Sequence, residues 1–384
     1  MGKMHGRKGW LIVIGVILLS ALLTEIILVA FVFHNKGKGD SDSTEKPKTT
    51  AEPTPNPTDE PDAPNDEPVT VFRVKSQYYE DPTETYCNNI YTFDANGNRT
   101  ERLWLNSEGG VEQRIEYRYD EKNRLIYSHW KNEYNMSEYT FEYAYDDRGR
   151  KTEETNRGRG YQFRTVYEYD DNDFLISQTE YSGEEEEMLY RYVFEYNDFG
   201  EVSQTGCYNA KGELYQMQKD EYDADGKLIE EREYKEPSHE LTRKIKVVYN
   251  EEGLLSERFS YQENDTLDSR EWYEYDERGN CTAEYYYVAP ILSSLRSGKT
   301  LRTFDEKNRE IREVSYYGDD ETEERFSHDK RTEYDENGCV IKETYLKEDG
   351  TLEYISRFEY VSFTVPYSTL TDEEKEWYER EHGK

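Results

Sequence analysis

The sequence contains little of what enzymes and thick hydrophobic cores are built from. Only 34% of its 384 residues are hydrophobic, whereas typical globular domains have about 45–50%. It has six histidines, and none is spaced from another histidine or from a cysteine as metal ligands are. It has no Gly-x-Ser-x-Gly, no phosphate-binding glycine loop and no His-Glu-x-x-His motif. We therefore predict that the protein is not an enzyme and that it has no catalytic, cofactor-binding or metal site.

Cysteine and positive charge are also scarce. The four cysteines, at positions 87, 207, 281 and 339, form no close pair, so we expect unpaired thiols that serve as small apolar residues. The chain has 49 Lys and Arg against 84 Asp and Glu, a net charge of −35. Such a surface repels phosphate backbones, which argues against binding to nucleic acid.

What the chain does have is a repeat. An aromatic residue followed by Asp or Asn recurs ten times at intervals of 24 to 30 residues, and Gly or Asn stands four residues after the aromatic in nine copies. The exception at this last position is Asp173. A period of this kind indicates one supersecondary unit copied many times. The aromatic positions are Phe93, Tyr119, Tyr145, Tyr169, Tyr196, Tyr222, Tyr249, Tyr275, Phe304 and Tyr334.

Each repeat has the pattern of a β-hairpin. Aromatic residues alternate with other residues before the motif, as in residues 139–145, which is typical of a strand with one packed face. Asp-x-x-Gly is a turn signal, and an aliphatic pair such as Leu125-Ile126 opens the second strand. We predict an all-β fold, a thin, long and curled antiparallel sheet of about ten tandem hairpins. One face should carry stacked Tyr rings, and the other should carry salt-bridged residues such as Arg191, Glu195, Lys244 and Lys246. Whether the sheet closes is left open.

The motif resembles the YD repeat of the Rhs and teneurin-like family. It is complete in Tyr143-Ala-Tyr-Asp-Asp-Arg-Gly149 and in Tyr273-Glu-Tyr-Asp-Glu-Arg-Gly279, and the resemblance covers about residues 90–360. It implies curled antiparallel sheets, often closed into shells, and an association with cell surfaces, glycan contacts and toxin encapsulation. The period here is longer than the family's usual one, and no toxin-like module follows the repeats.

The regions flanking the repeats suggest a membrane protein. Residues 10–33 are a run of 24 mostly apolar residues, long enough to span a bilayer as a signal-anchor helix. After the repeats, Ser368 or Thr371 is placed to cap a short helix that we expect to cover the last sheet edge. The predicted domains are a basic cytoplasmic tail (1–9), a transmembrane helix (10–33), a disordered Pro/Thr/acidic linker (34–68), the repeat domain (69–362) and a C-terminal tail with a capping helix (363–384).

These features predict a single-pass protein of the cell membrane with its C-terminal domain outside the cell. We expect a non-catalytic binding, adhesion or surface-scaffold module, with a cell-wall glycan, a host glycan or a surface protein as partner. The alternative, suggested by the family resemblance alone, is a toxin-associated or immunity protein. The residues expected to contact a ligand are the aromatic ladder of Tyr143, Tyr145, Tyr167, Tyr169, Tyr192 and Tyr196.

Overall fold

A computed structural model describes residues 67–183, 187–289, 297–318 and 324–382. All of these residues belong to one compact unit, Ala63–Lys384. The predicted basic tail, the transmembrane span at residues 10–33 and most of the linker lie outside the described residues. The described part is almost entirely β-structure, as the alternating pattern predicts.

The strands follow one another in tandem hairpins, most of them seven to ten residues long. The first eleven are β1 (Pro68–Glu80), β2 (Thr85–Phe93), β3 (Arg99–Leu105), β4 (Val111–Tyr119), β5 (Leu125–Asn132), β6 (Ser137–Tyr145), β7 (Lys151–Gly158), β8 (Tyr161–Tyr169), β9 (Leu175–Ser182), β10 (Glu187–Tyr196) and β11 (Val202–Asn209). The others are β12 (Leu214–Tyr222), β13 (Leu228–Lys235), β14 (Glu240–Tyr249), β15 (Leu255–Gln262), β16 (Leu267–Tyr275), β17 (Cys281–Val288), β18 (Ser297–Phe304), β19 (Glu310–Gly318), β20 (Arg325–Tyr334), β21 (Val340–Leu346) and β22 (Leu352–Pro366).

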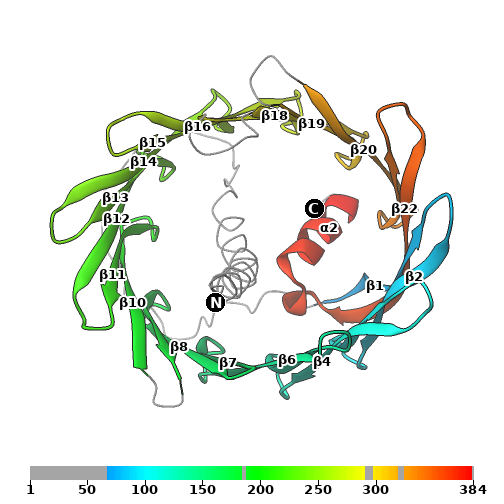
Figure 1. Cartoon of the computed structure of the whole chain (residues 1–384), viewed down its shortest axis with the longest axis horizontal. Helices are drawn as coiled ribbons and strands as arrows, with labels where there is room; N and C mark the ends of the chain where they lie inside the picture. Colours follow the sequence, from blue (N-terminus) through cyan, green and yellow to red (C-terminus); the bar gives the residue numbers. More distant parts are fainter. Residues whose placement is uncertain (1–66, 184–186, 290–296, 319–323, 383–384) are drawn as a thin grey trace, which may run out of the picture. The chain divides into compact units, whose positions relative to one another are not determined.

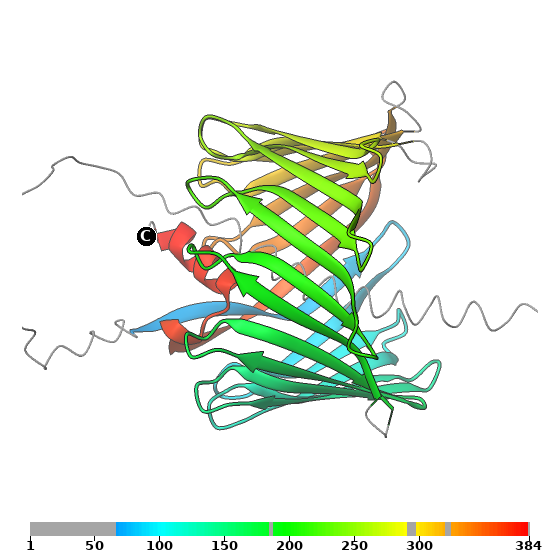
Figure 2. The same ribbon diagram turned by 90° about the vertical axis from the view of Figure 1, so that its left-hand side faces the viewer.

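The 22 strands form one sheet that closes on itself. Each strand pairs antiparallel with the next, and the first strand pairs with the last from Pro68↔Pro366 to Glu80↔Ile355. The result is a barrel with tilted strands (Figures 1 and 2). The prediction of a long curled sheet is therefore corrected: the ends of the sheet meet. Closure satisfies the backbone groups that two free edges would leave unpaired.

Among the described residues, no helix is both long and apolar enough to cross a membrane. The prediction of a sheet accompanied by a transmembrane signal-anchor helix therefore has no counterpart in the described structure.

The hairpin turns follow the sequence motif closely. In the turn after β6, Asp146 Oδ1 accepts the backbone N–H of Arg150, and the N–H of Gly149 donates to the Asp146 carbonyl at 3.0 Å. Gly149 has φ of +90°, the left-handed conformation that this turn requires. Asp173, the one residue that departs from Gly or Asn, adopts φ of +71° at the equivalent position. The prediction of ten equivalent hairpin turns is confirmed.

The C-terminal segment folds back onto the strand pair that closes the barrel. After β22, the chain forms a 3-10 turn, η2 (Tyr367–Thr369), and then helix α2 (Asp372–His382). Thr371 caps the helix: its Oγ1 accepts the N–H of Glu374 at 3.2 Å, and the Glu374 carboxylate accepts the N–H of Thr371 at 3.0 Å. This reciprocal capping box is a strong start signal. Of the two residues predicted as caps, Thr371 takes that role.

The helix packs against a small hydrophobic cluster. Val69, Val71, Val365 and Leu370 are each at most 8% exposed, and Trp377 is among the partly buried residues packed against them. Viewed down the barrel, α2 lies inside the ring beside β1 and β22, and the side view places it at one end (Figures 1 and 2). The helix therefore covers the closing strand pair from within, where a free sheet edge was expected.

Candidate functional site: the inner aromatic wall

The second aromatic residue of each motif lies on the inner face of the barrel. Tyr334 and Tyr360 line a cavity together with Glu374 and Trp377 of α2, and α2 lies inside the ring. Because side chains alternate between the two faces of a strand, residues two positions away share this face. The predicted period-two alternation is thus confirmed, and the aromatic face is the inner wall of the barrel.

Most of these tyrosines connect adjacent hairpins through their hydroxyl groups. Tyr145 Oη donates to the carbonyl of Leu125 at 2.8 Å, and Tyr169 Oη donates to the carbonyl of Lys151 at 2.9 Å. In each case the acceptor is the carbonyl of a residue that opens the second strand of the preceding hairpin, as Leu125 opens β5 and Lys151 opens β7. Each bond therefore joins one repeat to the previous one. We call these residues the bridging tyrosines: Tyr145, Tyr169, Tyr196, Tyr222, Tyr249, Tyr275, Tyr334 and Tyr360, with bonds of 2.7–3.1 Å.

Cations, rather than neighbouring bridging rings, cover several of these tyrosines. The guanidinium carbon of Arg124 lies 4.7 Å from the centre of the Tyr145 ring, and that of Arg150 lies 4.7 Å from the Tyr169 ring. The turn carboxylate holds each arginine in place, since Arg150 Nε donates to Asp146 at 2.7 Å. Such contacts contribute roughly 0.5–1 kcal/mol at exposed sites. The prediction that these tyrosine rings stack on one another is wrong at these positions. A cation covers each of these rings instead.

On each strand that ends in a second aromatic, the residue two positions earlier also faces the interior and pairs with a residue of the next strand. Together these cross-strand pairs form a belt around the inner wall. We call these ten pairs the inner belt. They contain six carboxylates and three guanidinium groups, an excess of three negative charges. The pairs are Tyr91–Arg102, Tyr117–Ser128, Tyr143–Glu154, Tyr167–Gln178, Phe194–Thr205, Asp220–Glu231, Val247–Arg258, Tyr273–Glu284, Arg302–Glu313 and Thr332–Glu343.

Burial between the rings perturbs the carboxyl groups of this belt. It raises the pKa of Asp220 to about 6, with the charge of Glu231 adding to the effect and a hydrogen bond from Gln218 opposing it. Burial also raises the pKa of Glu231, although Arg243 and Arg258 partly offset it. Burial likewise raises the pKa of Glu343. The inner belt therefore contains carboxyl groups that are partly withdrawn from water.

The six tyrosines predicted to contact a ligand all lie partly buried on this wall. Tyr145, Tyr169 and Tyr196 are bridging tyrosines, so their hydroxyl groups are already engaged. Tyr143 and Tyr167 come together: the ammonium group of Lys151 lies 5.8 Å from the first ring and 4.8 Å from the second.

Burial raises the pKa of these phenols above the ordinary value, with the charge of Glu154 adding to the effect at Tyr143 and Tyr167. The pKa of Tyr192 is raised by burial and by Cys207. All of these hydroxyl groups are therefore protonated and able to donate at neutral pH.

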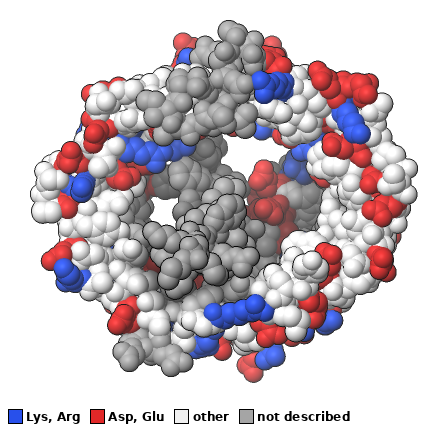
Figure 3. All heavy atoms as spheres, viewed as in Figure 1, with Lys and Arg blue, Asp and Glu red and all other residues white. Residues whose placement is uncertain are grey.

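The outer face is polar, as the alternation predicts. Glu142, Glu168 and Glu195 are exposed. Arg191 pairs with Glu168 at 3.4 Å, and Lys246 pairs with Glu230 at 3.8 Å. The space-filling view shows acidic and basic side chains interspersed around the ring (Figure 3). Surface pairs of this kind contribute little to stability, about 0–1 kcal/mol each.

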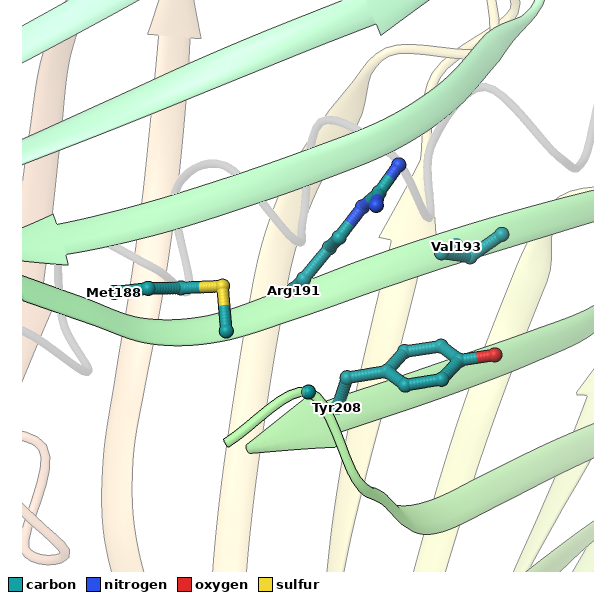
Figure 4. A pocket seen from close by; sticks show the side chains of 5 residues that line it. Met188, Arg191, Val193 and Tyr208 are labelled. Atoms are coloured by element: carbon teal, nitrogen blue, oxygen red, sulfur yellow. The ribbon is translucent and has the colours of Figure 1, made fainter. Parts of the chain in front are cut away.

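Two cavities of the described structure are large enough to consider as sites. One, of about 330 Å³, lies at β10 and β11 and is lined by Met188, Arg191, Val193, Tyr208 and Gly212 (Figure 4). Its charged group, Arg191, already pairs with Glu168. The other, of about 350 Å³, lies between α2, the closing strand pair and the turn between β20 and β21. The sequence predicted neither cavity, and the second depends on contacts of β1 and α2 that no repeat motif encodes.

Sequence reasoning also missed the inner belt, although the sequence contains a signal for it. The second member of each pair stands nine residues after a second aromatic, and five of the ten such positions are Glu. The four cysteines are free, with Cys207 and Cys339 buried and the other two partly buried. Among the described residues, no group of three or more His, Cys, Asp or Glu is placed to hold a metal ion.

Comparisons with known proteins do not assign this chain to a family, so the resemblance to the YD-repeat family stays a prediction. No family model matches the chain, and no curated protein matches it. Solved structures that resemble it include TcdB2-TccC3, at 14% identity and a TM-score of 0.30, covering 72% of this chain but 17% of that one. Two porin-like proteins also resemble it, from Bacteroides uniformis (11% identity, 75% and 96% of the two chains, TM-score 0.28) and Bacteroides vulgatus (10%, 75% and 98%, 0.25).

At these TM-scores, the similarities carry no argument about fold or function. The chain spans about a sixth of TcdB2-TccC3. The observed hairpin repeat is compatible with a YD-type β-fold.

Proposed function

We propose that the repeat barrel is a non-catalytic binding and scaffold module whose inner aromatic wall takes a glycan. The observation that supports this most is the pairing of Tyr143 and Tyr167 with the polar residues opposite them, Glu154 and Gln178. A sugar ring presents C–H groups on its flat faces and hydroxyl groups around its edge. Aromatic faces suit the former and carboxylates or amides suit the latter.

The wall is also held rigidly. The bridging tyrosines fix one hairpin to the next, and Lys151 is held between the Tyr143 and Tyr167 rings by its ion pair with Glu154 at 2.8 Å. A surface that is already ordered loses less conformational entropy when a ligand binds. Preorganised rings beside hydrogen-bonding groups therefore favour a binding role.

Charge restricts the class of glycan. The chain has a net charge of −35, and the inner belt has more carboxylates than guanidinium groups. A polyanionic chain would be repelled, because like charges raise the cost of association. We therefore propose a neutral or amino-substituted glycan as the ligand.

Glycan retention by the full-length chain tests this proposal. The chain is applied to immobilised neutral, amino-substituted and sulfated glycans, and Tyr143→Ala and Tyr167→Ala are compared with Tyr127→Ala. Tyr127 is an aromatic residue of the outer face, where Arg118 covers its ring at 4.6 Å. We expect retention on neutral or amino-substituted glycans, weakened by the two inner changes and unaffected by the outer one. Retention on none of the glycans, or equal loss in all three variants, would refute the proposal.

A further inference from the structure

A second group of aromatic rings lies on the inner wall of strands β5 to β8. The ring centres of Trp130 and Tyr139 are 4.9 Å apart, and those of Tyr139 and Tyr161 are 6.0 Å apart. Each of the two tyrosines stands an even number of residues before the bridging tyrosine of its own strand, and Trp130 is the cross-strand partner of Tyr139. All three rings therefore share the inner face. We call Trp130, Tyr139 and Tyr161 the rim platform.

The backbone and side chains around the rim platform hold it in place. Gly158 pairs with Tyr161 across β7 and β8, and a Cβ on this glycine would lie 2.6–2.7 Å from side-chain atoms of Tyr161 and Tyr139. The missing side chain therefore lets both rings lie against the backbone. The indole N–H of Trp130 donates to Gln113 at 3.3 Å, which fixes that ring as well. A surface that is already ordered loses less conformational entropy when a ligand binds.

The rim platform faces the lumen of the barrel. Its three residues are partly buried rather than fully buried, and a barrel of 22 strands is too wide for its own side chains to fill. The platform adjoins residues 133–136 and 159–160, two of the turns that do not carry the repeat motif. α2 contacts motif turns instead, since Glu381 pairs with Lys307 at 2.9 Å. The two kinds of turn lie at opposite ends of the strands, so α2 does not cover the opening beside the platform (Figure 2).

Neutral side chains connect the rim platform to the Tyr143 ring. One row of cross-strand partners lies between Tyr139 and Tyr143, and it contains Ser128, Phe141, Asn156, Phe163 and Ser182. None of these five residues is charged, although 35% of the residues in the chain are charged. A charged ligand would find no ion-pair partner in this row. Hydroxyl and amide side chains between aromatic rings suit a neutral sugar, with its hydroxyl groups and its C–H faces.

The spacing of the two groups of rings indicates the size of the ligand. Tyr139 stands four residues before Tyr143 on β6, and Tyr161 stands six residues before Tyr167 on β8. At the usual rise of a strand, these intervals correspond to about 13–20 Å. No single sugar ring is that long. Only an oligosaccharide that runs along the strands can contact both groups at once.

We propose that the inner wall of β5 to β8 is an extended track for a neutral, linear oligosaccharide, with the rim platform as a second subsite beyond the rings of Tyr143 and Tyr167. This inference rests on the proposed glycan-binding function and narrows the ligand to a neutral chain of several sugar units. One sugar ring packs on Tyr143 and Tyr167, another packs on the rim platform, and the units between them lie over the neutral row.

Calorimetric titration of the full-length chain with a short and a long neutral sugar tests the track. The pairs are cellobiose with cellohexaose and, separately, N-acetylated chitobiose with N-acetylated chitohexaose. In at least one pair, we expect the hexasaccharide to bind roughly tenfold more tightly than the disaccharide, which is the gain from one further aromatic contact. Tyr161→Ala should remove this gain and leave disaccharide binding within about twofold. Tyr161→Phe keeps the ring and should preserve the gain.

Trp272→Ala is the matched control. Trp272 adjoins Tyr273 of the inner belt and therefore points to the outer face, where its ring stacks on Tyr285 with the ring centres 5.0 Å apart. This variant also loses an aromatic contact between neighbouring strands, but it should bind the hexasaccharide as tightly as the natural chain does.

Equal affinity for the short and the long sugar in both pairs, or a gain that survives Tyr161→Ala, would overturn the track. If sugar length has no effect while glycan retention still depends on Tyr143 and Tyr167, the track is wrong and the proposed function stands. If no sugar binds and that retention is also absent, the proposed function itself fails.

Discussion

Tyr196→Ala is the change that examines the inner wall most closely. The ring is partly buried and packs at a tilt against Phe174, with the ring centres 4.6 Å apart, and its hydroxyl group donates to the carbonyl of Leu175 at 2.8 Å. Truncating a fully buried aromatic residue costs about 3–5 kcal/mol, so a half-buried ring should cost about 2 kcal/mol. The lost hydrogen bond adds about 0.5–1.5 kcal/mol. We therefore expect the free energy of unfolding to fall by about 2–4 kcal/mol.

Two matched variants separate these contributions. Tyr196→Phe keeps the ring and removes the hydroxyl group, so it should cost about 1 kcal/mol. Glu195→Ala changes the adjacent, exposed residue on the outer face of the same strand and should cost no more than about 0.5 kcal/mol.

Denaturant melts followed by circular dichroism give the three values, and hydrogen exchange locates the damage. Because neighbouring repeats share their interfaces, faster exchange should be confined to β9, β10 and β11. Equal costs for Tyr196→Ala and Glu195→Ala would show that the inner and outer faces have been assigned wrongly.

Three further predictions follow from the turns, the inner belt and the helix. Gly149→Ala should lower the free energy of unfolding by about 1–2 kcal/mol through backbone strain alone. A Cβ at Gly338 would also strike Glu381 of α2. Only Gly338→Ala should therefore speed hydrogen exchange in residues 372–382. Burial raises the pKa of Asp220 from 3.8 to about 6. Between these pH values the folded state binds more protons than the unfolded state does. The contribution of Asp220 to stability therefore falls as pH rises through that window. The stability of Asp220→Asn relative to the natural chain should thus grow from pH 4 to pH 6.5, by about 1–2 kcal/mol after allowance for partial exposure, and a pH-independent difference in thermal melts would contradict the assignment. Glu374→Ala removes the ion pair with Arg73 and half of the capping box, so α2 should detach more readily, by about 1–2 kcal/mol, seen as a red shift of Trp377 emission.

The hairpins were predictable because their information is local. The alternation of residues 139–145 and the turn at Asp146 need only a few neighbouring residues to specify strand, turn and face. Even Asp173, which breaks the consensus, adopts the left-handed conformation of its equivalents, since Asp tolerates that region better than most residues.

Closure was not predictable from the repeat, because it depends on two strands outside the motif. β1 pairs with β22 from Pro68↔Pro366 to Glu80↔Ile355, so the paired residues lie 275 to 298 positions apart in the chain. The motif is lost after Tyr360 and is absent before Phe93. The available signal was the alternating run Val69-Thr-Val-Phe-Arg-Val74, which is typical of a strand but names no partner. The inward docking of α2 depends on the same strand pair and was missed for the same reason.

The most direct test of the closed barrel is a pair of cysteines across β1 and β22 in a chain whose natural cysteines are replaced by serine. Thr70 and Thr364 are direct cross-strand partners and both are exposed, so Thr70→Cys with Thr364→Cys should form an intramolecular disulfide under mild oxidation. Thr70→Cys with Phe363→Cys, shifted by one residue and therefore on opposite faces, should not. The closed barrel predicts one fast-migrating, reducible monomer band for the first pair and none for the second. Equal cross-linking of both pairs, or disulfides only between molecules, would contradict it.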